Sequence, residues 1–414
     1  MPPHSSFDAI DRIPPGRGPD PANVVRCLFR CLFRHRRCLV HASRRSLLVI
    51  LALAVACHLP RTHAADEATI RAAVARAAAY LATEGQAADG SFSAQAGPAI
   101  TALAVTALVR TGTPPDAPVV DKAVAYLVGF KRDDGGIHPP DSLVANYETS
   151  ITLMALAACN RDGRHDATIK AAERFVKGLQ WDDDEGKGSA DPAYGGAGYG
   201  RKNRPDLSNT VFLLEALETA GADKDDEAIR RALVFISRTQ NLPGPYNTLP
   251  FAPKNPDGGF YYTPAAGGES QAGATAEGGL RSYGSMTYAG LKSMIFAGLT
   301  RDDPRVKAAV SWLAKHYTFT ENPGLGDSGL YYYFQTAAKA LDALGDETFA
   351  DATGVRHAWR NELSDALLAK QQPDGSWVNT NPRWMEGDKN LVTSYALLAL
   401  APCLPKPAKP AKAP

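Results

Sequence analysis

Two carboxylate side chains lie where strongly apolar segments begin in this 414-residue chain. They are the residues best suited to act as a general acid or base. Glu148 directly precedes the apolar stretch 149–159, and Asp206 lies just ahead of the apolar stretch 209–217. A carboxyl group shielded from water holds its proton more tightly and can act as an acid or a base near neutral pH. Helix starts also favour carboxylates, so capping is the alternative role. We take Asp206 and Glu148 as the catalytic candidates.

Aromatic and polar residues recur at the starts of the other apolar segments, and the segment 383–389 is expected to overhang the same rim. If these segments are helices that begin at one end of the fold, their first residues lie together there. An aromatic wall with a few polar anchors is typical of a small-molecule pocket. Each tyrosine taken alone could instead cap a helix or stack on its neighbour. The predicted ligand-binding residues are Tyr147, Asn209, Arg281, Tyr283, Tyr332, Arg383, Trp384, Glu386 and Tyr395.

Metal, cofactor and nucleic-acid partners have little support in the sequence. The acidic run Asp182–Glu185 offers oxygen ligands of the kind that Mg²⁺ and Ca²⁺ prefer. Its charged, Gly-rich surroundings are more typical of a solvated loop. The formal net charge is +1, whereas a general nucleic-acid binder carries a basic face. We predict no metal, no cofactor and no nucleic-acid partner.

Two kinds of helix must position these residues. The first kind is amphipathic, with apolar residues three, four and seven positions apart, as in Val120, Val124 and Leu127. The second kind is nearly free of charge and apolar all round, as in 99–109 and 391–400, which is typical of a buried helix. The two kinds alternate six times along the chain.

Gly-rich turns follow the amphipathic helices, for example Asp374-Gly375-Ser376-Trp377. Glycine adopts positive φ angles and aspartate bonds its own backbone, so these segments reverse the chain. Six helical hairpins that close on themselves predict an all-α fold, an α6/α6 toroid with two concentric helix layers. We expect one toroid domain over 66–403, followed by a Pro/Ala/Lys-rich, solvated tail over 404–414.

The N-terminal region has the pattern of an export signal. Residues 1–46 are predicted to be a disordered basic leader, and 47–64 a signal peptide with an apolar core after Arg44-Arg45 and cleavage after Ala64. The apolar core is too short to span a bilayer, so no transmembrane segment is predicted. We expect a periplasmic or secreted protein. The Sec and twin-arginine routes both stay open, and a lipid anchor at Cys57 is the less favoured alternative.

The turns carry a family resemblance. Gln371-Gln372-Pro373-Asp374-Gly375-Ser376-Trp377 and the segment Glu84–Phe92 resemble the repeats of the prenyltransferase and squalene-cyclase superfamily. The resemblance covers about 66–403 and implies the α6/α6 toroid. It does not imply an activity, because such toroids also serve as binding domains.

The chemical motifs of the superfamily are not reproduced at the matching positions. Squalene-type cyclases start catalysis with a D-x-D-D motif, and the matching segment here has Asp206 followed by Ser208 and Asn209 in place of the second and third carboxylates. Protein prenyltransferases hold zinc with Asp, Cys and His, and the comparable starts 282–287 and 391–395 contain neither Cys nor His.

These observations favour an exported toroid that binds an apolar, isoprenoid-like ligand or a protein partner in its central cavity without turnover. The alternative is a terpenoid cyclase or prenyltransferase-type enzyme with a rearranged acid site built on Asp206 or Glu148. A third hypothesis is a structural envelope module that uses the toroid to bind proteins.

Overall fold

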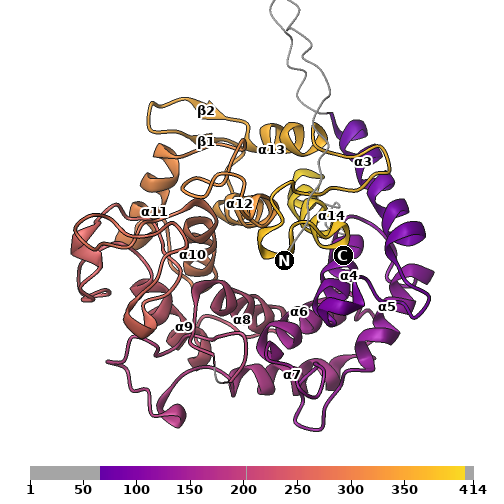
Figure 1. The fold of residues 1–414 in the computed structure, drawn as a ribbon, viewed down its shortest axis with the longest axis horizontal. Helices are drawn as coiled ribbons and strands as arrows, with labels where there is room; N and C mark the ends of the chain where they lie inside the picture. The colour runs from indigo at the N-terminus through magenta and orange to yellow at the C-terminus, as the bar shows by residue number, and fades with distance from the viewer. Residues whose placement is uncertain (1–65, 202, 406–414) are drawn as a thin grey trace, which may run out of the picture. The chain divides into compact units, whose positions relative to one another are not determined.

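Helices alternate between an inner and an outer ring in the computed structural model, which describes residues 66–201 and 203–405 (Figure 1). The described part contains twelve α-helices. The outer helices are α3 (Glu67–Tyr80), α5 (Pro118–Val128), α7 (Asp166–Lys177), α9 (Glu227–Arg238), α11 (Pro304–Lys315) and α13 (Trp359–Leu368). The inner helices are α4 (Ala99–Arg110), α6 (Ala145–Ala158), α8 (Leu207–Thr219), α10 (Gly284–Phe296), α12 (Leu330–Leu344) and α14 (Lys389–Leu400).

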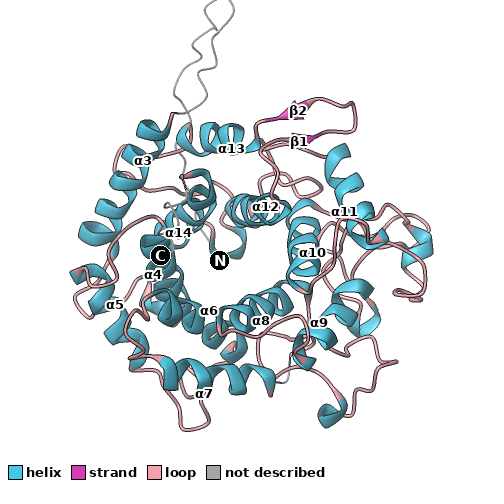
Figure 2. Ribbon diagram, turned by 180° about the vertical axis from the view of Figure 1, so that it is seen from behind, coloured by secondary structure: helices cyan, strands magenta, loops and turns pink. Residues whose placement is uncertain are grey.

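The burial of the two kinds of helix explains the two layers. Each inner helix buries an almost continuous run, such as every residue from 99 to 108 in α4. The outer helix α9 buries one face, which includes Ile229, Ala232 and Phe235. Each inner helix packs against the next, and α14 packs against α4, so the ring closes (Figure 2). The predicted all-α toroid is therefore confirmed.

Short elements complete the described part. A two-stranded antiparallel sheet joins β1 (Phe349–Ala350) to β2 (Arg356–His357), with Phe349 opposite His357. A π-helical turn, η1 (Leu81–Gly85), extends α3. The 3₁₀ turns are η2 (Ala94–Ala96), η3 (Asp183–Glu185), η4 (Ala252–Lys254), η5 (Ala265–Gly267), η6 (Arg383–Met385) and η7 (Ala401–Cys403).

Hydrogen bonds from Gly-rich turns hold several hairpins to the neighbouring outer helix. In four of them a glutamine amide donates one hydrogen bond to a glycine carbonyl of its own turn and another to a carbonyl in the neighbouring outer helix. The last of these turns closes the ring on the first helix, since Gln371 donates to Gly375 and to Ala73 of α3, both at 2.9 Å. Gly375 has φ 88°, and a Cβ there would lie 2.5 Å from the carbonyl oxygen of Arg76. The other glutamines are Gln86, Gln180 and Gln240.

Several predictions concern residues outside the described part. The leader over 1–46, the signal peptide over 47–64, the anchor at Cys57 and the tail beyond residue 405 all lie there. Within the described residues, no helix is both long and apolar enough to cross a membrane.

Candidate functional site

Side chains from the first turns of the inner helices meet on the inside of the ring. The Ser208 hydroxyl lies 3.0 Å from the Tyr332 hydroxyl, and the ring of Phe212 lies 6.4 Å from that of Tyr332. Ser208 and Phe212 belong to α8 and Tyr332 belongs to α12, whereas α10 stands between these two helices in the ring (Figure 2). A contact that bypasses α10 in this way has to run along the inner surface.

Further tyrosines extend this contact around the ring. The Tyr147 ring of α6 lies 5.1 Å from Phe212 and 6.0 Å from Tyr199, and Tyr395 of α14 lies 5.9 Å from Tyr332. Tyr147 and Tyr395 are also hydrogen-bonded to each other. Edge-to-face and tilted rings at these separations stabilise one another beyond their buried area. We call six residues the tyrosine cluster: Tyr147, Tyr199, Tyr262, Tyr283, Tyr332 and Tyr395.

Asp206 is the buried acid of this cluster. It caps α8, because one carboxylate oxygen accepts the Asn209 backbone N–H at 2.9 Å and the other accepts the Asn209 amide at 2.8 Å. The Tyr262 hydroxyl is a further hydrogen-bonding partner. The side chain is 2% exposed, and burial raises the pKa of Asp206 to about 6 although these hydrogen bonds favour the charged form. The structure thus brings Asp206 and Asn209 together with the tyrosines.

Asp206 should make the folded protein less stable as the pH rises, whereas most carboxyl groups in proteins make it more stable. Because its folded pKa is raised from 3.8 to about 6, its contribution is fully present below pH 4 and is lost as the pH rises through 6. The stability of the wild type relative to Asp206→Asn should therefore fall by about 3 kcal/mol between pH 4 and pH 7. Urea unfolding of both proteins at a series of pH values measures this difference.

Asp374 provides the control of opposite sign. The ammonium group of Lys389 and the hydroxyl of Ser376 lower the pKa of Asp374 to about 2. The advantage of the wild type over Asp374→Asn should accordingly be present at neutral pH and decline as the pH falls towards 2. If Asp206→Asn and Asp374→Asn respond to pH in the same sense, our assignment of a buried, proton-retaining Asp206 is wrong.

Glu148 has separate partners and does not join Asp206. Its carboxylate accepts a hydrogen bond of 2.5 Å from the Ser142 hydroxyl, and the side chain is buried. Burial raises the pKa of Glu148, while the Ser142 hydrogen bond opposes the rise. The two catalytic candidates are therefore two distinct acids on neighbouring inner helices rather than a pair that shares a proton.

The residues of the predicted rim segment 383–389 differ in burial and in the groups that they contact. The buried Glu386 accepts the backbone N–H groups of Tyr331 at 3.0 Å and Tyr332 at 2.8 Å, so it caps the start of α12. Arg383 donates to the Gln271 side chain at 2.7 Å and stacks on Trp384 with 4.2 Å between guanidinium and ring. Glu386 thus positions the backbone beneath Tyr332, whereas Arg383 and Trp384 are exposed at the rim.

Of the remaining predicted residues, Tyr283 belongs to the tyrosine cluster, whereas Arg281 contacts a loop carbonyl elsewhere. Tyr283 is buried, and the raised pKa of its hydroxyl follows mainly from burial, with contributions from Tyr332 and Asp206. Arg281 is exposed and donates to the carbonyl of Ala274 at 3.1 Å. Sequence reasoning missed Tyr199 and Tyr262, because both precede helix α8 or α10 in Gly-rich loops rather than at a helix start.

The acidic segments of the chain have structural partners. Asp182 caps the 3₁₀ turn η3 and forms an ion pair with Arg231. A literal D-x-D-D sequence occurs at Asp223–Asp226, away from the matching position. It belongs to the turn before the outer helix α9, where Asp226 caps the helix and binds Lys177 at 2.7 Å. In the described residues no group of three or more His, Cys, Asp or Glu side chains is placed to hold a metal ion.

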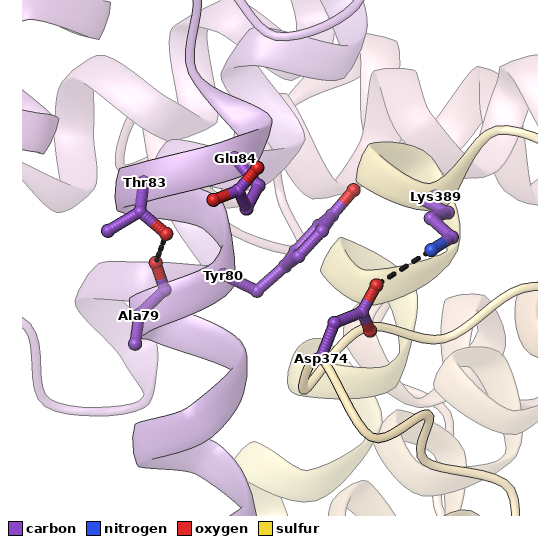
Figure 3. Close-up of a pocket in the computed structure, with 6 residues that line it drawn as sticks. All are labelled: Ala79, Tyr80, Thr83, Glu84, Asp374 and Lys389. Carbon is purple, nitrogen blue, oxygen red and sulfur yellow. Dashed lines mark hydrogen bonds and ion pairs between the residues drawn. The ribbon is translucent and has the colours of Figure 1, made fainter.

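A surface pocket of about 580 Å³ lies apart from the predicted site, at the seam between the first and last helical hairpins (Figure 3). Its ion pair joins Lys389 to Asp374 at 2.7 Å, and Lys389 also lies 5.9 Å from the ring of Tyr80. Two of the charged groups on this wall, those of Lys389 and Asp374, therefore already contact each other. None of the predicted site residues lines it; the lining residues are Ala79, Tyr80, Thr83, Glu84, Asp374 and Lys389.

Residues 95–263 match the family model of the squalene-hopene cyclase C-terminal domain. The resemblance to squalene cyclases is thereby confirmed. The matched stretch of this squalene-cyclase-like toroid includes Glu148, Asp206 and three members of the tyrosine cluster. No curated protein matches the sequence.

The matching solved structures have low sequence identity to this chain. A Salmonella enterica protein described as a possible member of the GH105 family is 11% identical, with a TM-score of 0.51 over 88% of this chain and 98% of its own. An Actinoplanes protein is 16% identical, with a TM-score of 0.46 over 82% and 99% of the two chains. The type II terpene cyclase MstE from Scytonema is 14% identical, with a TM-score of 0.31 over 80% and 97%. The likeness to the Salmonella protein concerns the fold alone.

Proposed function

We propose that this protein is a binding toroid that holds an apolar, isoprenoid-like ligand against the tyrosine cluster without converting it. The observation that carries the proposal is the arrangement of the inner-helix starts. Tyr147 and Tyr332 are partly exposed residues, while the acid beside them, Asp206, is buried. Aromatic surface with a few fixed polar groups suits an apolar ligand.

The chemistry of Asp206 supports binding over cyclisation. Protonating an alkene requires an acid stronger than ordinary aspartic acid, and burial makes Asp206 a weaker one. Ser208 and Asn209 stand where the cyclase motif has carboxylates. In this chain Ser208 bonds Tyr332 and Asn209 donates its N–H groups to Asp206. An enzyme with a rearranged acid site remains the alternative that a product would reveal.

We also propose that the protein acts outside the cytoplasm, on the strength of the signal-like sequence at 47–64. Sequencing the N-terminus of the protein purified from its own organism tests this part separately. We expect the first residue to be Ala65, and a chain that retains residues 1–64 in the cytoplasmic fraction would contradict export.

The full-length chain, purified under native conditions, should yield an isoprenoid-like molecule when its organic extract is analysed by mass spectrometry. All-trans-retinol serves as the probe for titration, because its C20 isoprenoid body quenches tryptophan fluorescence on binding. Tyr332→Leu should weaken retinol binding about tenfold, since an aromatic contact and its buried area are lost. Tyr246→Leu is the matched control, because Tyr246 is half exposed and stacks on Arg305 of the outer layer.

Three outcomes separate the hypotheses. An empty protein that does not bind retinol contradicts the ligand-binding proposal and favours the protein-binding module. Equal effects of Tyr332→Leu and Tyr246→Leu contradict the tyrosine cluster as the site. A retinol or extract-derived product that forms with the wild type and not with Asp206→Asn contradicts the absence of turnover.

A further inference from the structure

A charged layer lies two helical turns deeper in the ring than the first layer of site residues. Seven residues rise about 10 Å along an α-helix and return nearly to the same face. The spacing of seven recurs on three inner helices, from Ser208 to Glu215 in α8, from Ser285 to Lys292 in α10 and from Tyr332 to Lys339 in α12. Three ionisable side chains therefore share one level below the tyrosine cluster.

These three side chains contact one another on the inside of the ring. The Glu215 carboxylate forms ion pairs with Lys292 through one oxygen and with Lys339, at 2.8 Å, through the other. Since α10 separates α8 from α12, the pair between Glu215 and Lys339 crosses the inner surface. Lys292 is fully buried, with its ammonium group 5.8 Å from the Phe296 ring, whereas the Lys339 side chain keeps 14% of its surface exposed. Lys339 is thus the accessible member of the layer.

The layer carries more positive than negative charge. Two ammonium groups face the single carboxylate of Glu215. Two exposed charges that interact electrostatically with this layer, Arg110 and Glu218, are of opposite sign. A buried charge without a counter-charge is costly, so the imbalance favours binding of an anion. Burial, with the positive charges of Lys292 and Arg110, lowers the pKa of Lys339 to about 8 against the opposing effect of Glu215.

We infer that Lys339 and Lys292 bind the anionic head group, a carboxylate or phosphate, of an amphiphilic ligand whose apolar body lies against the tyrosine cluster. This inference rests on the proposed function and narrows its ligand class from apolar molecules to isoprenoid-like acids or phosphate esters. Lys339 supplies the accessible ammonium group, and Glu215 holds both lysines in place.

A pair of matched probes separates the head group from the body. All-trans-retinol and all-trans-retinoic acid have the same C20 skeleton and differ in a neutral or an anionic head. Titration of the full-length protein by tryptophan quenching should show that the wild type binds the acid at least about tenfold more tightly than the alcohol, the effect of one charge-assisted hydrogen bond. Lys339→Met should abolish this preference and leave retinol binding unchanged.

Two further variants keep the test specific. Lys339→Arg retains the charge and should retain the preference for the acid. Lys389→Met removes a lysine from the rim, where it binds Asp374, and should also leave the preference unchanged. Because Lys339→Met still leaves the Lys292–Glu215 pair intact, the protein should fold, and its thermal unfolding is measured to check this.

The results distinguish the two levels of the proposal. If retinol binds and the acid shows no preference, or if Lys339→Met and Lys389→Met affect both probes alike, the head-group site is overturned while the apolar site stands. If neither probe binds the wild type, the proposed function fails and the head-group site fails with it. Loss of acid preference in Lys339→Met together with its retention in Lys339→Arg supports the site.

Discussion

Glu215→Gln is expected to lower the free energy of unfolding by about 3–5 kcal/mol, although the two side chains have nearly the same shape. The substitution leaves the ammonium groups of Lys292 and Lys339 in the inner ring without the carboxylate that both contact. Breaking a buried ion pair is expensive because the remaining charge stays desolvated. Urea unfolding at pH 7, followed by far-ultraviolet circular dichroism, measures the loss.

Two comparisons identify the cause of that loss. The triple variant Glu215→Gln, Lys292→Met, Lys339→Met carries no charge in the layer. It should recover most of the lost stability, because apolar residues of similar volume replace the two ammonium groups that Glu215→Gln alone leaves unpaired. Glu218→Gln, one turn further along α8 and exposed, should change stability by less than about 0.5 kcal/mol. A Glu215→Gln protein as stable as the wild type would show that water reaches the layer freely.

The same layer contributes to acid sensitivity. Burial alone would raise the pKa of Glu215, but the ammonium groups of Lys292 and Lys339 hold it below its usual value. A carboxyl with a depressed folded pKa stabilises the protein at pH values above its unfolded pKa, and this contribution is lost as the pH falls. Glu215 and Asp206 therefore act in opposite directions as the solution is acidified.

The fold was predictable because its causes are local and repeated. Helices that are apolar all round, such as 99–109, have to be buried, and amphipathic helices have to cover them. The glycine and glutamine residues of Gln371–Trp377 predict a chain reversal, and in the structure this turn binds the outer helix α3. The closure of α14 on α4 follows from the same contact repeated around the ring.

The residues of the candidate site could be predicted where they lie at helix starts. Two that lie in loops, and the isolated charges inside the helices, were not predicted. Tyr147, Asp206 and Tyr332 come together because parallel inner helices begin at one end of the ring. Tyr199 and Tyr262 reach Asp206 from loops whose paths follow no periodic pattern. The single charges of Lys292 and Lys339 inside apolar helices were a usable signal, since a lone charge in a buried helix requires a partner.

Trp377→Ala is expected to produce the largest loss of stability among the turn residues, about 3–5 kcal/mol. The indole is fully buried, and its N–H donates to the carbonyl of Leu367 in α13 at 2.8 Å. The backbone N–H of Trp377 donates to the Thr393 hydroxyl of α14 at 3.0 Å, so the residue joins the outer and inner helices of the last hairpin. Replacing the indole by a methyl group leaves a cavity between α13 and α14.

Trp384→Ala provides the matched control, because it makes the same substitution at a tryptophan in the same hairpin. Trp384 is 44% exposed at the rim and stacks on Arg383, so its loss should cost less than about 1 kcal/mol. Urea unfolding of both variants compares them directly. Because Gln371 and Gly375 of the same turn hold α3, the Trp377→Ala protein should also expose the N-terminal helix to hydrogen exchange before the rest of the ring. Equal losses in the two variants would contradict the cavity at the junction of α13 and α14. Exchange that is uniform around the ring would mean that Trp377 does not stabilise the seam between the last turn and α3.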